Sequence, residues 1–101
     1  MAKTVYVSIG NSDDKLSQAE WSRFFTEVDL RLEGFATHGR WLSAPNALFQ
    51  NACWCVVIPE HSVEGLKRWL RRTAKKYRQD SIAWAEAVTT FLIPEGNNHA
   101  E

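Results

Sequence analysis

The sequence of 101 residues lacks the short motifs by which most catalytic and cofactor-binding sites are recognised. It contains no glycine-rich phosphate loop, no dinucleotide-binding fingerprint, no histidine-rich metal motif and no pair of carboxylates at a known catalytic spacing. We therefore expect neither a cofactor nor a bound metal. The sequence favours a non-enzymatic binding or regulatory function over catalysis.

Cysteine is scarce, and long apolar runs are missing. The only cysteines, Cys53 and Cys55, lie two residues apart. On a regular strand their Cα atoms would be roughly 6.5–7 Å apart, at or beyond disulfide reach, so we expect reduced thiols, as in the cytoplasm. No apolar run approaches the ~20 residues of a membrane span, and Met1 to Lys3 leads into a strand pattern rather than a signal peptide. The sequence predicts a cytoplasmic protein with no membrane partner.

A net charge is also missing, but the charges are unevenly distributed. The chain has 12 basic and 12 acidic residues, and seven of the basic ones fall within residues 66–78, where there is no acid. This segment is the strongest indication of a binding surface in the sequence, because a local excess of one charge attracts partners of the opposite charge.

Hydrophobic periodicity predicts six elements in the order strand, helix, strand, strand, helix, strand. The predicted strands cover residues 4–9, 35–42, 52–58 and 81–93, and the helices cover about 17–34 and 62–78. This order predicts an α+β ferredoxin-like βαββαβ sandwich, with a four-stranded antiparallel sheet and both helices on one face. We expect a single domain over residues 1–94 and a flexible tail over residues 95–101.

Local signals set the expected ends of these elements. Ser17 and Glu20 form a capping-box pattern at the start of the first helix, and Ser62 is the expected cap of the second. The last strand is expected to be strongest at residues 88–93, which have high β propensity, whereas residues 82–87 would also tolerate a helix.

The middle strands are expected to form a hairpin around Pro45-Asn46-Ala47. In that register His38 would lie opposite Cys55, and Arg40 opposite Cys53, on the sheet face away from the helices. A slip of one residue would exchange the faces.

The cationic residues of the second helix are the leading candidate site. They would cover the side opposite its apolar stripe and dock an acidic protein, as an inhibitor from a mobile element would, with nucleic acid as the alternative partner. The bland interpretation pairs them with Glu20, Glu27, Asp29 and Glu33 of the first helix. The proposed binding residues, including one aromatic anchor, are Lys67, Arg68, Trp69, Arg71, Arg72, Lys75 and Lys76.

The open sheet face is the second candidate, as a small-molecule enzyme or sensor site. The residues expected there are Tyr6, His38, Arg40, Cys53 and Cys55. They supply three metal ligands at most, fewer than a structural zinc site needs. The bland interpretation makes the cysteines small hydrophobes under a homodimer interface, which we expect because the face would otherwise expose an apolar patch.

An RNA-recognition motif shares this fold and provides a further alternative. Residues 5–11 resemble its shorter strand signature, with Tyr6 in the place of a stacking aromatic. The third strand should add further aromatics, but it offers Cys53, Cys55 and Val57 there, so half of the signature is missing.

Three segments carry a resemblance to a known family. They are Leu16-Ser17-Gln18-Ala19-Glu20-Trp21 with Phe24 or Phe25, then Gly39-Arg40-Trp41, then Tyr77-Arg78-Gln79-Asp80-Ser81-Ile82. Their order and spacing resemble a family of small bacterial proteins, a domain of unknown function, over roughly residues 5–85. The resemblance implies the βαββαβ order and no assigned activity, so it supplies no catalytic residue. This chain departs from the family in its two cysteines and its more basic second helix.

Overall fold

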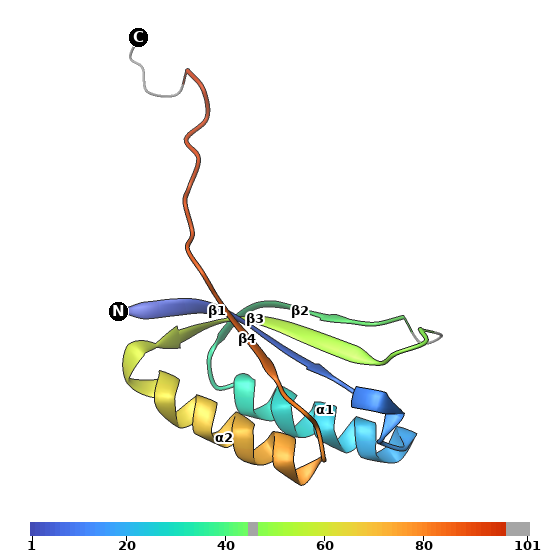
Figure 1. Ribbon diagram of the computed structural model, residues 1–101. Coiled ribbons are helices and arrows are strands. Elements are labelled where there is room, and N and C mark those ends of the chain that lie inside the picture. The colour runs from blue at the N-terminus through green and yellow to red at the C-terminus, as the bar shows by residue number, and fades with distance from the viewer. Residues whose placement is uncertain (45–46, 97–101) are drawn as a thin grey trace.

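A computed structural model describes residues 1–44 and 47–96 and shows one sheet with two helices packed against the same side of it (Figure 1). The predicted centre of the hairpin loop at Pro45 and Asn46, and residues 97–101 of the predicted tail, lie outside the described residues. The elements, in chain order, are β1 (Ala2–Gly10), η1 (Ser12–Asp14), α1 (Gln18–Leu32), β2 (Ala36–Leu42), β3 (Asn51–Pro59), η2 (Glu60–Ser62), α2 (Val63–Lys76) and β4 (Ala83–Ala87).

The sheet has four antiparallel strands in the order β2-β3-β1-β4. This order and the placement of both helices confirm the predicted α+β ferredoxin-like fold. β2 and β4 form the two edges of the sheet, and the face opposite the helices is open (Figure 1). No helix in the described part of the chain is both long and apolar enough to cross a membrane.

The core lies between the sheet and the helices, as the alternation of the central strands requires. Every second side chain of β1 and β3 points into the core, and the apolar faces of α1 and α2 cover these side chains. The largest of the fully buried side chains is Trp54, on β3. The principal core residues are Val5, Val7, Ile9, Phe24, Val28, Leu32, Trp54, Val56, Ile58, Leu66 and Leu70.

The start of α1 confirms the predicted capping box. The Glu20 backbone N–H donates to Ser17 Oγ at 3.1 Å, and the Ser17 N–H donates to Glu20 Oε1 at 3.0 Å. The predicted cap of α2 is wrong, because Ser62 makes no side-chain capping hydrogen bond. The 3₁₀ turn η2 begins directly after Pro59, so the backbone at Ser62 is already helical and cannot act as an N-cap.

The hairpin register is correct at one end of β2 and wrong at the other. Ala36 and Thr37 lie opposite Val57 and Val56, as the predicted register requires, but an irregularity follows between Thr37 and Gly39. His38 is the extra residue of this β-bulge, and the pairing of residues 39–42 is displaced by one. The displacement moves Arg40 to the helix side of the sheet and Trp41 to the open face.

The predicted strand over residues 81–93 is too long. β4 covers only Ala83–Ala87, the part expected to be ambiguous, whereas residues 88–93 form no regular structure and extend away from the sheet (Figure 1). High β propensity does not form a strand without a neighbouring strand to bond, and the ladder between β1 and β4 ends at the pair Thr4 and Ala87.

Candidate docking interface

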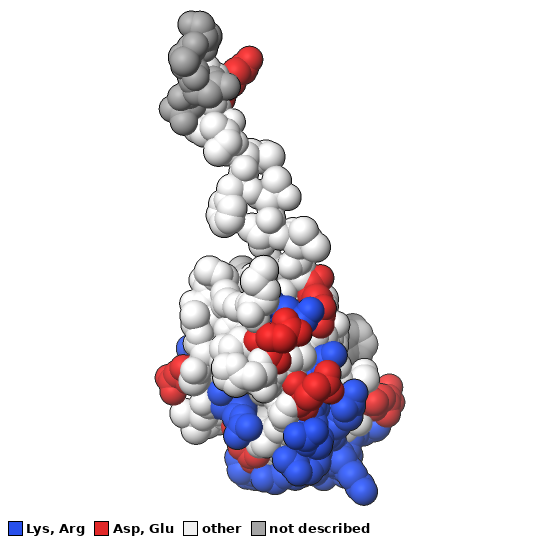
Figure 2. Space-filling model, turned by 90° about the vertical axis from the view of Figure 1, so that its left-hand side faces the viewer, with Lys and Arg blue, Asp and Glu red and all other residues white. Residues whose placement is uncertain are grey.

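The cationic residues of the second helix lie on the side of α2 that faces away from the core. The stripe of Val63, Leu66, Leu70 and Thr73 is buried against the sheet and α1. The opposite side carries positive charge, and Figure 2 shows Lys and Arg side chains gathered over the helical layer of the molecule. The amphipathic pattern therefore places the predicted binding residues at the surface.

Acids pair with only part of this surface. Lys76 Nζ lies 2.9 Å from Glu27, and Arg78 lies 3.1 Å from Glu20, so α1 neutralises the C-terminal end of α2. Lys67 lies 4.0 Å from Glu64 of its own helix. The remaining four cations form no ion pair with any described residue, and we call them the α2 patch: Arg68, Arg71, Arg72 and Lys75.

The other two acids of α1 that could have neutralised the patch do not reach it. Asp29 pairs with Arg40 of β2, with 2.6 Å between Asp29 Oδ2 and Arg40 Nη1. Glu33 makes no ion pair within the described residues. The bland interpretation of the basic helix therefore holds for Lys76 and Arg78 but not for the α2 patch.

Trp69 is half-buried between the helices. It packs against the core, and the Arg31 guanidinium of α1 lies 5.2 Å from the centre of its ring. Such a contact is a cation–π interaction. Its position at the edge of the patch leaves part of the ring accessible, but the indole also joins α1 to α2.

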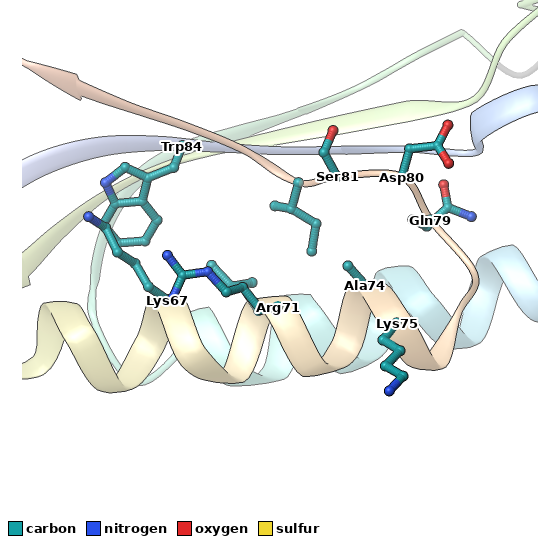
Figure 3. Close-up of a pocket in the computed structure, with 10 residues that line it drawn as sticks. Lys67, Arg71, Ala74, Lys75, Gln79, Asp80, Ser81 and Trp84 are labelled. Carbon is teal, nitrogen blue, oxygen red and sulfur yellow. The ribbon is translucent and has the colours of Figure 1, made fainter.

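A groove of about 560 Å³ runs between α2 and the segment that leads into β4. Its apolar floor includes Leu70, Ala74, Ile82 and Trp84, and Lys67 and Arg71 reach from α2 toward the strand side, while Lys75 points away (Figure 3). Lys67 Nζ lies 5.2 Å from the Trp84 ring centre. The groove therefore combines an apolar base with a cationic wall.

The sequence did not identify this groove. Its strand-side wall comes from Gln79, Asp80, Ser81, Ile82 and Trp84, and the prediction for the last two was ambiguous between strand and helix. The alternation of Ile82 and Trp84 was the available signal, because residues two apart on a strand share a face.

The open sheet face brings together three of its five predicted residues. Tyr6 lies opposite Cys55 in the β1–β3 ladder, and Cys53 lies two residues further along β3. Cys55 is buried and its thiol raises the pKa of Tyr6 above the ordinary value. Trp41, which the predicted register had put on the other face, stacks on Tyr6 with 6.3 Å between ring centres.

The other two residues predicted for that face are separated from the cluster. His38 occupies the bulge of β2, and Arg40 lies on the helix side, where its guanidinium is 5.6 Å from the ring centre of Phe25. Asp29 accepts hydrogen bonds from Arg40 at 2.6 Å and from Trp54 Nε1 at 2.8 Å. Burial opposes ionisation of this carboxyl, but these two donors hold the pKa of Asp29 below its ordinary value.

The open face offers few groups for chemistry. Within residues 1–44 and 47–96 no three His, Cys, Asp or Glu side chains are placed to hold a metal ion. The cluster of Tyr6, Trp41, Cys53 and Cys55 supplies aromatic surface and two thiols, with no carboxylate or imidazole opposite them in the strand register. It resembles a packing surface more than a reaction centre.

The segments that carry the family resemblance all make tertiary or capping contacts. The first supplies the capping box of α1, and the second supplies the Arg40–Asp29 pair. In the third, the Tyr77 hydroxyl donates to Glu27, and Gln79 Oε1 accepts from the Ser12 backbone N–H at 2.8 Å. The chain matches no protein-family model and no curated protein sequence.

Proposed function

We propose that this protein is a non-enzymatic binding module that docks an acidic protein surface through the α2 patch. The observation that supports the proposal is the set of four cations that form no ion pair within residues 1–44 and 47–96, on a chain with formal net charge +0. Like charges four residues apart destabilise a helix by a few tenths of a kcal/mol per pair. A partner that brings carboxylates to the patch relieves this repulsion.

An acidic protein fits better than nucleic acid. Nucleic-acid-binding domains are commonly basic overall, with a pI above about 9, whereas the sequence pI here is about 6.8. Acids elsewhere on the surface, such as Asp13, Asp14 and Glu60, would repel a long phosphate backbone that extends beyond α2. A compact acidic surface meets the α2 patch without meeting those acids.

The first prediction tests the patch by charge reversal. The triple variant R68E/R71E/R72E should lose the partner in affinity capture from native cells, because attraction becomes repulsion over the same surface. As a matched pair of single reversals, Arg72→Glu should weaken capture, whereas Arg23→Glu, at an exposed cation of α1 that forms no ion pair among the described residues, should retain the partner. Circular dichroism should be the same for all variants and the wild type.

The capture should be run with and without nuclease and over a range of salt. A protein partner that survives nuclease, and that is released as salt screens the charges, supports the proposal. Loss of all captured material on nuclease treatment would instead show that the α2 patch binds nucleic acid. Equal capture by the wild type and by R68E/R71E/R72E would show that the α2 patch is not the docking site.

A further inference from the structure

The segment after β4 is rich in apolar and β-branched residues, and its large side chains are exposed rather than packed into the core. We call residues 88–93 the arm; it leaves the sheet after Ala87 and extends into solvent (Figure 1). Val88 is 97% exposed, Phe91 84%, Leu92 88% and Ile93 69%. Soluble proteins rarely expose a continuous apolar segment of this kind unless it meets a partner.

The arm pairs with no strand among the described residues. In the β1–β4 ladder Thr4 lies opposite Ala87, so only Lys3 and Ala2 would remain to face the next two arm residues. β1 and the arm diverge at this point, and a hollow of about 290 Å³ lies between them. The four residues from Thr90 to Ile93 have no backbone of β1 to bond.

The outer edge of β4 is a free strand edge. β4 is the last strand of the sheet and pairs only with β1 among the described residues. Its outward N–H and C=O groups are a template for one more strand. The described residues thus include a free strand edge and, directly after it in sequence, a segment of high strand propensity that pairs with no strand.

We propose that two copies of this chain exchange their arms, each arm adding a strand to the β4 edge of the other copy. Residues 83–93 then form one long strand that pairs antiparallel with its counterpart around a two-fold axis at Val88. Such an interface is isologous, because the same residues meet from both sides. The exchange is independent of the α2 patch and places the interface at β4, not on the open sheet face.

The lengths of the two segments match this arrangement. β4 has five residues, Ala83–Ala87, and five arm residues, Thr89 to Ile93, follow the axis residue. Pro94 comes next and cannot donate a backbone hydrogen bond, so it ends the added strand where β4 of the second copy begins.

The side chains also match on both faces of the sheet. On the open face β4 presents only Ala83, Ala85 and Ala87, because these pair with Ser8, Tyr6 and Thr4 of β1. The arrangement puts Ile93 of the second copy opposite Ala83 and Phe91 opposite Ala85. Large side chains therefore meet small ones.

On the helix side, the arm reaches the groove beside α2. Leu92 of the second copy falls opposite Trp84, which lines that groove together with Leu70 and Ile82. Trp84 is only partly buried in the single chain. The exchanged leucine covers the apolar floor and leaves the outward side of α2 unobstructed.

The second prediction concerns the oligomeric state of the full chain, measured by sedimentation velocity from about 1 to 100 µM. The wild type should be a dimer, and F91D/L92D should raise its dissociation constant about 100-fold or more, since two buried apolar side chains are replaced by charges. The control L48D/F49D alters two other exposed apolar residues, between β2 and β3, and should remain dimeric. A wild-type monomer throughout, or a dimer unaffected by F91D/L92D, would overturn the proposal.

A cysteine cross-link tests the register. In a C53A/C55A background, Val88→Cys places two thiols across the axis with Cα atoms about 4.5–5.5 Å apart, within disulfide range. Glu86→Cys places the two thiols four residues apart along the strands, roughly 13 Å, out of range. Rapid oxidation of the first variant alone to a covalent dimer supports the exchange, and equal or reversed cross-linking contradicts it.

Discussion

Asp29 is the residue that joins most parts of the structure. It lies on α1, accepts a hydrogen bond from the buried Trp54 of β3, and pairs with Arg40 of β2. One carboxylate therefore fixes a helix to two strands. It also satisfies the indole N–H of the largest side chain in the core.

The third prediction concerns this carboxylate. Asp29→Asn should lower the free energy of unfolding at pH 7 by about 1 kcal/mol, since the charge-assisted bond is lost but Arg40 is half-exposed and solvent screens the pair. The folded pKa of Asp29 is lowered, so its contribution is complete above the unfolded pKa of about 3.9 and is lost as pH falls through the folded value. Urea unfolding of both proteins should therefore differ at pH 7 and converge in strong acid.

Glu33→Gln is the control for that measurement. It removes a carboxylate at the end of the same helix that forms no ion pair among the described residues, so stability should change little. If Asp29→Asn unfolds at the same urea concentration as the wild type at pH 7, the Arg40–Asp29 pair does not stabilise the fold.

Tyr77 makes the stability of the fold depend on pH in the alkaline range. Its hydroxyl is buried and donates to Glu27, and burial together with this bond raises the pKa of Tyr77 from 10.0 to about 12. Glu27 changes in the opposite sense: the bond from Tyr77 outweighs burial and holds the pKa of Glu27 below its ordinary value. The pair is stable only while the phenol keeps its proton.

The fourth prediction follows from the sign of that shift. Because the folded pKa of Tyr77 is raised, its stabilisation is complete below pH 10 and is lost as pH rises through about 12. Tyr77→Phe should unfold more easily at pH 8, and its stability should fall less steeply than that of the wild type between pH 10 and 12. An equal slope for Tyr77→Phe and the wild type between pH 10 and 12 would contradict the assignment.

At the scale of single elements, the start of α1 depends on local bonds alone. The reciprocal bonds between Ser17 and Glu20 satisfy two backbone N–H groups that the helix itself leaves unpaired. All of the groups involved lie within four residues. The sequence therefore contained the full information for this helix start.

The fifth prediction is that Ser17→Ala lowers the free energy of unfolding by about 1 kcal/mol, the usual cost of losing a side-chain cap. Ser22→Ala makes the same substitution at an exposed position inside α1, where alanine is the better helix former, and should be neutral or slightly stabilising. Thermal unfolding followed by circular dichroism distinguishes them. Equal melting temperatures for the two variants would show that the cap contributes nothing.

The strands depend on partners distant in the sequence, and here prediction was weaker. The predicted β2 register was wrong after His38 because regular alternation does not reveal an extra residue in a strand, and Arg40 meets Asp29 in the displaced register. The predicted length of β4 was wrong because strand propensity is high up to Ile93, whereas the ladder with β1 ends at the pair Thr4 and Ala87. Both errors have the same cause: a ladder needs two strands.

At the scale of the whole molecule, the fold and the position of the cations could be predicted from the sequence. The order of elements and the two helical stripes were sufficient for the sheet with helices on one side. Which cations form no ion pair in the described part of the chain was not predictable, because Glu27 and Glu20 reach Lys76 and Arg78 only through the packing of α1 beside α2. The groove beside α2 is likewise a product of packing.

The bulge at His38 has a consequence for comparing this chain with related ones. If a relative lacks the extra residue, an alignment with no gap at position 38 would match residues 39–42 with side chains on the other side of the second strand. An alignment should therefore open its gap at position 38. With the gap elsewhere, a solvent-facing tryptophan and a salt-bridged arginine would be exchanged, and the surfaces of two similar proteins would look different for no physical reason.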